Sequence, residues 1–97
     1  MSPKFVSVII PVYNDLKLLS TCLECLDRQT YPKTRFEVLV VDNGSDLPVQ
    51  PIVSRYSNVK LEKESMPGSY AARNRGIAAA RGEILAFTDA DCRPSPT

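Results

Sequence analysis

Histidine and tryptophan are absent from this sequence of 97 residues. Without histidine, the chain cannot build a histidine-ligated zinc site or a Ser-His-Asp triad from its own residues. Its three cysteines are an odd number for a disulfide framework and fit reduced thiols in the cytosol. A site in this chain therefore has to consist of carboxylates, arginines, hydroxyls and backbone groups.

A strong charge imbalance and long apolar runs are missing too. The 12 basic residues face 11 acidic ones, whereas a nucleic-acid-binding domain carries a basic stripe, so nucleic acid is not an expected partner. Apolar runs such as Val38–Val41 are far shorter than the roughly 20 residues that cross a bilayer, and residues 1–4 lack a secretory hydrophobic region. We expect a soluble, cytoplasmic chain that forms one small domain.

Four segments are predicted to be strands. Residues 6–12 and 36–41 are nearly continuously apolar and β-branched, which is typical of strands buried on both faces of a parallel sheet. Residues 58–62 predict a weaker strand, and residues 83–87 predict one that leads into an acidic cluster.

Three helices are predicted between these strands. Leucines three and four residues apart, after the capping-type residue Asn14, predict an amphipathic helix over 16–26. A short helix is predicted near 51–56, and an alanine-rich helix over 69–80 with Ser69 as its cap. This alternation predicts an α/β fold, a Rossmann-like, doubly wound, mostly parallel sheet with helices on both faces.

Three glycines accompany the alanine-rich helix. Gly68 is interpreted as its flexible start, and Gly76 as a place where the helix approaches the sheet closely. Gly82 stands at a position suited to a C-terminal cap.

Polar clusters follow three of the predicted strands, at residues 13–15, 42–45 and 89–91. Ligands of doubly wound sheets bind beyond the carboxyl ends of the strands. We therefore expect these three loops to converge on one edge of the sheet.

Asp89 and Asp91 are two residues apart on a chain that leaves a strand. If the chain stays extended, both carboxylates point to the same side, with the small Ala90 between them. Paired hard oxygen ligands suit Mg²⁺ or Mn²⁺ and leave coordination positions for water and substrate phosphates. A solvated turn after the strand is the alternative interpretation.

Asp42 ends a buried strand, where a carboxylate without a partner would be costly. It either caps its own turn through the amides of 43–45 or, if the first two strands are neighbours, lies beside Tyr13. The Tyr13 ring could then stack on a nucleobase while Asp42 accepts from a base N–H, so a nucleoside pocket is a hypothesis. Arg73 is expected to face a ligand phosphate and Arg75 the solvent, since residues two apart on a helix point in different directions.

Five segments in a fixed order carry a resemblance that covers almost the whole chain. They are Val-Ser-Val-Ile-Ile-Pro-Val-Tyr-Asn (6–14), Gln-Thr-Tyr-Pro (29–32), Phe-Glu-Val-Leu-Val-Val-Asp-Asn-Gly-Ser-Asp (36–46), Ala-Ala-Arg-Asn-Arg-Gly (71–76) and Gly-Glu-Ile-Leu-Ala-Phe-Thr-Asp-Ala-Asp (82–91). With these segments the sequence resembles the family 2 glycosyltransferases of the GT-A fold.

The resemblance implies an enzyme that moves a sugar, with inversion, from a UDP- or GDP-sugar to the hydroxyl of an unidentified acceptor. A divalent cation, Mn²⁺ or Mg²⁺, is the implied cofactor. Residues 1–97 are expected to be one partial domain, the donor-binding half, with the acceptor site and general base beyond Thr97. A longer parent protein could lie at the cytoplasmic face of a membrane. The alternative is a non-catalytic nucleotide-binding or interaction module that retains the fold.

Residue roles carried over from the family concern the nucleotide first. Pro11, Val12 and Tyr13 are similar to the loop that meets the nucleoside. Asp42 is similar to the base-binding acid, and Arg73 to the arginine on the nucleotide side.

Asp89 and Asp91 are similar to the family's Asp-x-Asp pair, in which Asp91 would be the direct metal ligand and Asp89 would also contact the nucleotide sugar. Asn43 departs from the family, which usually has a second acidic residue there. Pro48 and Pro51 also depart from it and predict an irregular second helix. The open sheet edge after the fourth strand predicts self-association.

Overall fold

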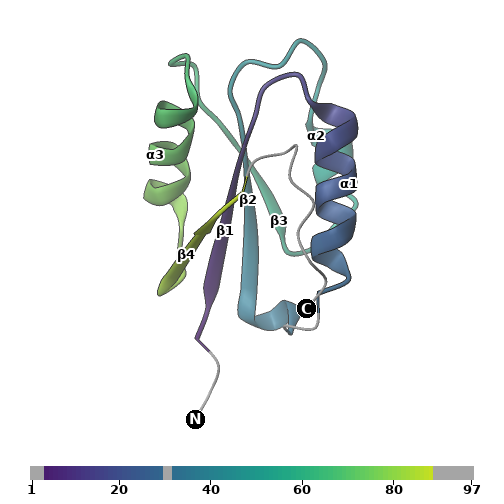
Figure 1. Cartoon of the computed structure of the whole chain (residues 1–97), viewed down its shortest axis with the longest axis vertical. Coiled ribbons are helices and arrows are strands. Elements are labelled where there is room, and N and C mark those ends of the chain that lie inside the picture. The colour runs from purple at the N-terminus through teal and green to yellow at the C-terminus, as the bar shows by residue number, and fades with distance from the viewer. Residues whose placement is uncertain (1–3, 30–31, 89–97) are drawn as a thin grey trace.

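The computed structural model of the chain describes residues 4–29 and 32–88. Figure 1 shows a parallel sheet with strand order β3-β2-β1-β4 and helices on both faces, which confirms the predicted α/β fold. The strands are β1 (Val6–Val12), β2 (Phe36–Asp42), β3 (Val59–Lys63) and β4 (Ile84–Phe87). The helices are α1 (Leu16–Asp27), α2 (Gln50–Val53) and α3 (Ser69–Ala79), with a 3-10 turn, η1 (Lys33–Arg35), before β2.

The two most apolar strands, β1 and β2, lie at the centre of the sheet. Every residue of β2 is buried, whereas the outer strands β3 and β4 are short and partly exposed. Val12 pairs with Asp42 in the β1–β2 register, so these two strands end side by side. The loops that follow them begin at the same edge of the sheet.

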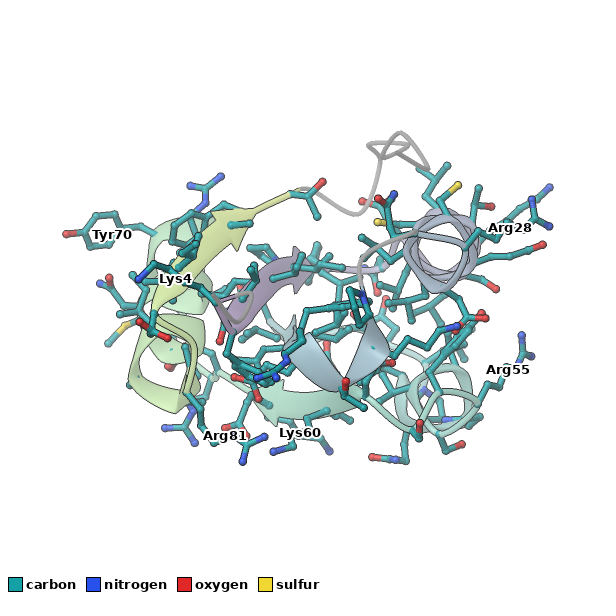
Figure 2. The ribbon with its side chains drawn as sticks, turned by 90° about the horizontal axis from the view of Figure 1, so that it is seen from below. Lys4, Arg28, Arg55, Lys60, Tyr70 and Arg81 are labelled. Carbon is teal, nitrogen blue, oxygen red and sulfur yellow. The ribbon has the colours of Figure 1, made fainter. Side chains whose placement is uncertain are left out.

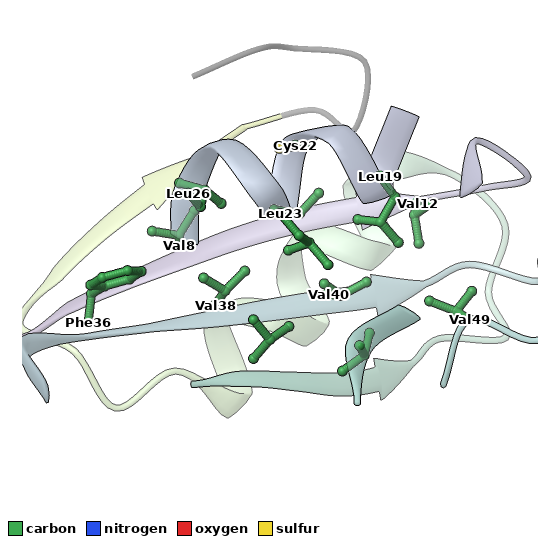
Figure 3. Packing of buried hydrophobic residues seen from close by; sticks show 13 residues of the cluster. Val8, Val12, Leu19, Cys22, Leu23, Leu26, Phe36, Val38, Val40 and Val49 are labelled. Atoms are coloured by element: carbon green, nitrogen blue, oxygen red, sulfur yellow. The ribbon is translucent and has the colours of Figure 1, made fainter. Parts of the chain in front are cut away.

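One face of the sheet packs against α1 and α2 (Figure 1). Alternate residues of a strand point to opposite faces, so β1 and β2 each contribute every second side chain here. Figure 3 shows the buried leucines of α1 packed over valines of β1 and β2. The buried residues shared by α1, β1 and β2 are Leu19, Cys22, Leu23, Leu26, Val8, Ile10, Val12, Val38 and Val40.

The opposite face packs against α3, where Ala72 is buried against Ile9, Leu39 and Val41. Gly76 allows this helix to come close to the sheet. A Cβ atom at position 76 would collide with the Ile9 side chain, whose Cγ1 would lie 3.2 Å away. The close approach predicted for Gly76 is confirmed.

The helix N-termini differ from the predicted caps. The N-cap of α1 is Asp15, because Asn14 adopts a left-handed backbone with φ of 64°. The N-cap of α3 is Gly68 and not Ser69, which is already helical. Gly68 has φ of 108°, a conformation that glycine takes without steric cost.

Gly82 does not cap α3, which ends at Ala79 with Ala80 as its C-cap. Instead, the lack of a side chain at Gly82 allows the chain to pass close to β1. The Gly82 N–H donates to Ser7 Oγ at 2.8 Å, and a Cβ atom at position 82 would lie 2.6 Å from the Ser7 nitrogen.

A buried carboxylate joins the strands at the N-terminal edge of the sheet. Glu37, with its side chain 3% exposed, accepts from the Ser7 hydroxyl at 2.7 Å and from the Arg81 backbone N–H at 2.8 Å. The Arg81 and Lys60 cations lie next to each other here (Figure 2), at 3.4 and 3.8 Å from Glu37 Oε1. Burial raises the pKa of Glu37, but the hydrogen bonds from Arg81 and Ser7 and the Arg81 charge outweigh it, so the pKa is lowered.

The strand β4 forms one edge of the sheet within the described part of the chain. Its apolar side chains Ile84, Leu85 and Phe87 are 45%, 39% and 48% exposed. Self-association through such an edge stays a prediction. Within residues 4–29 and 32–88, no helix has the length and apolar character to cross a membrane.

Candidate functional site

The loops after β1 and β2 lie side by side at the C-terminal edge of the sheet, the upper end of Figure 1. The Asn43 backbone N–H extends the strand pairing by one step, donating to the Val12 carbonyl at 2.9 Å. Tyr13 and Asp42 thus lie on neighbouring chain segments, as the sequence predicted for adjacent strands.

Asn14 links the two loops in both directions. Its backbone N–H donates to Ser45 Oγ at 2.9 Å, and its side-chain Oδ1 accepts from the Asp46 N–H at 2.8 Å. The left-handed backbone of Asn14 turns the chain between β1 and α1, a conformation that asparagine tolerates better than most residues. The loops therefore form one connected rim beside Tyr13.

Asp42 is 9% exposed at the end of β2. Its Oδ1 accepts from the Ser45 N–H at 2.9 Å, so it caps its own turn, one of the two roles considered for it. Within the described residues, no hydrogen bond reaches its Oδ2. Asp42 also lines a cavity of about 400 Å³ together with Val49, Leu61 and Lys63.

Asn43 connects the β2 loop to the segment between β3 and α3. Its Nδ2 donates to the carbonyls of Glu64 at 3.0 Å and Met66 at 2.7 Å, and its Oδ1 accepts from the Gly68 N–H at 2.9 Å. Both Nδ2 hydrogens of the side-chain amide thus donate, and its Oδ1 accepts one hydrogen bond. Asn-Gly in the sequence indicates a local turn and does not predict these contacts with residues 64–68.

An open pocket of about 450 Å³ lies between Tyr13 and the segment that Asn43 holds. Tyr13 is 60% exposed, so its ring is available to a ligand. The other lining residues are Asn43, Ser65, Pro67 and Gly68. Ser65 and Pro67 do not belong to a motif that would identify them as site residues from the sequence.

The other residues with expected nucleotide roles are less exposed. Pro11 is partly buried, and the Val12 side chain lies in the core on the α1 face, which leaves its backbone to meet a ligand. Arg73 is partly buried on α3. Arg75 is half-exposed, as expected for a solvent-facing position, and its Nε lies 3.6 Å from Glu62 Oε1.

Asp89 and Asp91 lie outside the described residues. The residue before them, Thr88, donates its backbone N–H to the Ile9 carbonyl at 3.1 Å, so the chain leaves β4 alongside β1. Residues 4–29 and 32–88 contain no cluster of three carboxylate or thiol side chains able to hold a metal ion.

The parallel sheet, covered on both faces and carrying an open pocket at its C-terminal edge, defines a doubly wound α/β domain of the kind that binds ligands at this edge. The family model Glycosyl transferase family 2 matches residues 7–97, and the chain belongs to this family.

A curated relative, glycosyltransferase AglE of Haloferax volcanii, is 50% identical over 95 residues, which are 93% of this chain and 31% of AglE. The crystal structure of residues 1–349 of Staphylococcus aureus TarS has a TM-score of 0.88 and 35% identity, over 95% of this chain and 29% of that one. The mannosyltransferase PcManGT of Pyrobaculum calidifontis, solved with GDP-Man and Mn²⁺, has a TM-score of 0.88 and 32% identity, over 99% of this chain and 30% of that one. The chain therefore spans about a third of their length and has the fold of GT-A glycosyltransferases.

Proposed function

We propose that this chain is the donor-binding part of an inverting glycosyltransferase and binds a nucleotide-diphospho-sugar at the C-terminal edge of its sheet. The observation that carries the proposal is the open pocket between the exposed Tyr13 ring and residues 65–68. Two structures with this fold support it, since TarS was solved with UDP-GlcNAc and PcManGT with GDP-Man.

The nucleoside would occupy the pocket beside Tyr13. The exposed phenol ring offers a flat apolar face on which a base can stack. Asp42 lines the separate cavity with Val49 and Lys63, and its Oδ2 would be the oxygen that accepts from a base N–H, because Oδ1 already accepts from Ser45. Pro11 and Val12 would contribute backbone at the base of this loop, and Arg73 would contact the diphosphate through its planar, charged donors.

Asp91, together with Asp89, would hold Mn²⁺ or Mg²⁺. The two carboxylates fit such an ion because they are hard oxygen ligands. The strand β4 runs parallel to β1, toward the same edge of the sheet. A divalent ion supplies positive charge where the departing nucleoside diphosphate develops negative charge. PcManGT, solved with Mn²⁺, supports this assignment.

Calorimetric titration of the chain with UDP and GDP, with and without Mn²⁺, tests the proposal. We expect Tyr13→Ala to weaken binding with or without the metal, whereas Tyr70→Ala, which removes a 77% exposed tyrosine from α3, should not. Figure 2 shows Tyr70 pointing away from the sheet.

Asp91→Ala should abolish the metal-dependent part of the affinity and leave the fold intact. Asp27→Ala is its matched control, because Asp27 pairs with Lys33 at the far end of α1. Unchanged affinity in Asp91→Ala would contradict the metal assignment. A folded chain that binds neither UDP nor GDP would contradict the proposed function.

A further inference from the structure

The two outer strands of the sheet differ in how their edges are built. The strand β3 carries the charged side chains of Lys60, Glu62 and Lys63, and charges on an outer strand prevent pairing with other chains. The strand β4 is the other outer strand within the described residues (Figure 1), and its sequence, Ile-Leu-Ala-Phe, has no charge and no proline. The edge at β4 is therefore open to a further strand, whereas the edge at β3 is protected.

The backbone groups that β4 presents at this edge are those of Leu85 and Phe87. The Thr88 N–H donates to the Ile9 carbonyl at 3.1 Å, so Thr88 and every second residue before it face β1. The backbone groups of successive residues in a strand point to opposite sides of the strand. The N–H and C=O groups of Leu85 and Phe87 therefore point away from β1, toward the open edge.

We propose that β4 forms the interface of a homodimer, in which β4 of a second copy lies antiparallel to it about a two-fold axis at Ala86. In this register Leu85 of each copy lies opposite Phe87 of the other. Both pairs consist of residues with outward backbone groups, so each pair can exchange two N–H···O bonds. A shift by one residue would oppose outward groups to groups that already face β1. A shift by two residues toward Glu83 would need its N–H, which already donates to the Phe5 carbonyl at 2.9 Å.

The side chains match in the same register. Phe87 pairs with Ile9 of β1, whose side chain lies on the α3 face, so Leu85 and Phe87 both point to that face. Both are partly exposed. Opposed side chains of an antiparallel pair contact each other, so each leucine would pack against the phenylalanine of the second copy. On the other face, Ile84 and Ala86 bring no charge into the interface.

The helix α3 adds an apolar side chain on the same side. Arg75 lies 3.6 Å from Glu62 of β3, so this part of α3 points toward β3. Ile77 is two residues further along, about 200° around the helix, and therefore points toward β4. Its side chain is 44% exposed. The apolar surface at the β4 edge thus continues from the strand onto the helix that covers it.

Association of this kind stops at two copies. A two-fold axis at Ala86 uses the open edge of both copies, and the outer strand that remains on each is the charged β3. The inference is independent of the proposed nucleotide binding, because the β4 edge is not part of the pocket beside Tyr13.

Sedimentation of the 97-residue chain at concentrations from about 1 μM to about 1 mM tests the proposal. We expect an equilibrium between monomer and dimer. Leu85→Lys should weaken dimerisation at least about tenfold, because each dimer then loses two apolar pairs and gains two charges at its interface. Leu47→Lys is the matched control, since Leu47 is an exposed leucine beside β3, where it lines a cavity with Leu61 and Lys63. It should dimerise like wild type.

Amide hydrogen exchange of the wild type locates the interface. The amides of Leu85 and Phe87 should exchange more slowly as the concentration rises, because they are paired only in the dimer. The Thr88 amide already donates to Ile9 and should change far less.

A chain that stays monomeric at about 1 mM overturns the proposal, and so does a dimer that Leu85→Lys leaves intact while circular dichroism shows a folded variant. A dimer in which the exchange of Leu85 and Phe87 does not depend on concentration would also overturn it, since the contact would then involve another surface. Assembly into larger species without a dimer would contradict the two-fold register. Should Leu85→Lys not fold, the exchange measurement on the wild type decides.

Discussion

Replacing Glu37 by alanine is expected to destabilise the chain by about 2–4 kcal/mol, because two donors lose a charged acceptor. The carboxylate accepts from the Ser7 hydroxyl and from the Arg81 backbone N–H, and its side chain is 3% exposed. Ser7 is fully buried, so water cannot replace the lost acceptor there. A hydrogen bond to a charged group contributes about 1.5–3 kcal/mol. Two such bonds would contribute about 3–6 kcal/mol, and the expected loss of about 2–4 kcal/mol is smaller because water can replace the acceptor at the more exposed Arg81.

The isosteric change Glu37→Gln should cost less, about 1–2 kcal/mol, since its carbonyl can still accept while the charge is lost. The ion pairs with Arg81 and Lys60 add little to this figure, because those side chains are 65% and 51% exposed. The order of stability is therefore wild type, then glutamine, then alanine.

Urea unfolding followed by circular dichroism measures these differences. Glu24→Ala is the control, because it removes an exposed ion pair with Arg28 on α1 and should cost no more than about 0.5 kcal/mol. If Glu37→Ala is no more destabilised than Glu24→Ala, the buried network does not stabilise the sheet as argued.

Three further predictions concern acid stability, helix packing and the β1 turn. Folding lowers the pKa of Glu37, so the ionised carboxylate stabilises the folded state fully above about pH 4.3 and loses this effect as the pH falls through the lower pKa of the folded state. In urea unfolding below that pH, the free energy of unfolding should therefore fall less steeply with pH for Glu37→Gln than for wild type. Gly76→Ala should lower the melting temperature, since crowding of Ile9 costs about 1–3 kcal/mol against a helix-propensity gain of about 1 kcal/mol, whereas the exposed Asn74→Ala should raise it. In thermal unfolding, Asn14→Ala should lower the free energy of unfolding by about 1–2 kcal/mol more than Asn14→Gly. Both variants lose the bond to Asp46, but only alanine is strained at φ of 64°. Equal losses would contradict the left-handed conformation of residue 14 as the cause.

Elements with a strong local pattern were predictable from the sequence. The strand predicted over residues 6–12 has the same bounds as β1. The helix predicted from the leucine spacing agrees with α1 to within one residue. The outer elements shifted, with β3 at Val59–Lys63 in place of 58–62 and α2 shorter than expected. Their bounds depend on pairing and loop contacts rather than on their own sequence.

The site was predictable in outline and not in its connections. Tyr13 and Asp42 follow strands whose adjacency the α/β pattern suggests. The role of Asn43 depends on partners 21 to 25 residues away, and Asn-Gly in a sequence indicates only a local turn. The missed wall residues Ser65 and Pro67 follow from the same long-range contacts.

The central claim, nucleotide binding at the C-terminal edge of the sheet, is tested most directly by titrating the ¹⁵N-labelled chain with UDP and GDP in the presence of Mg²⁺. The predicted result is a set of amide shifts centred on residues 12–14, the β2 loop at 42–45 and the pocket wall at 65–68, together with Arg73, Asp89 and Asp91. Shifts centred on Ser7 and Glu37 at the opposite edge, or none in a folded chain, would contradict the account.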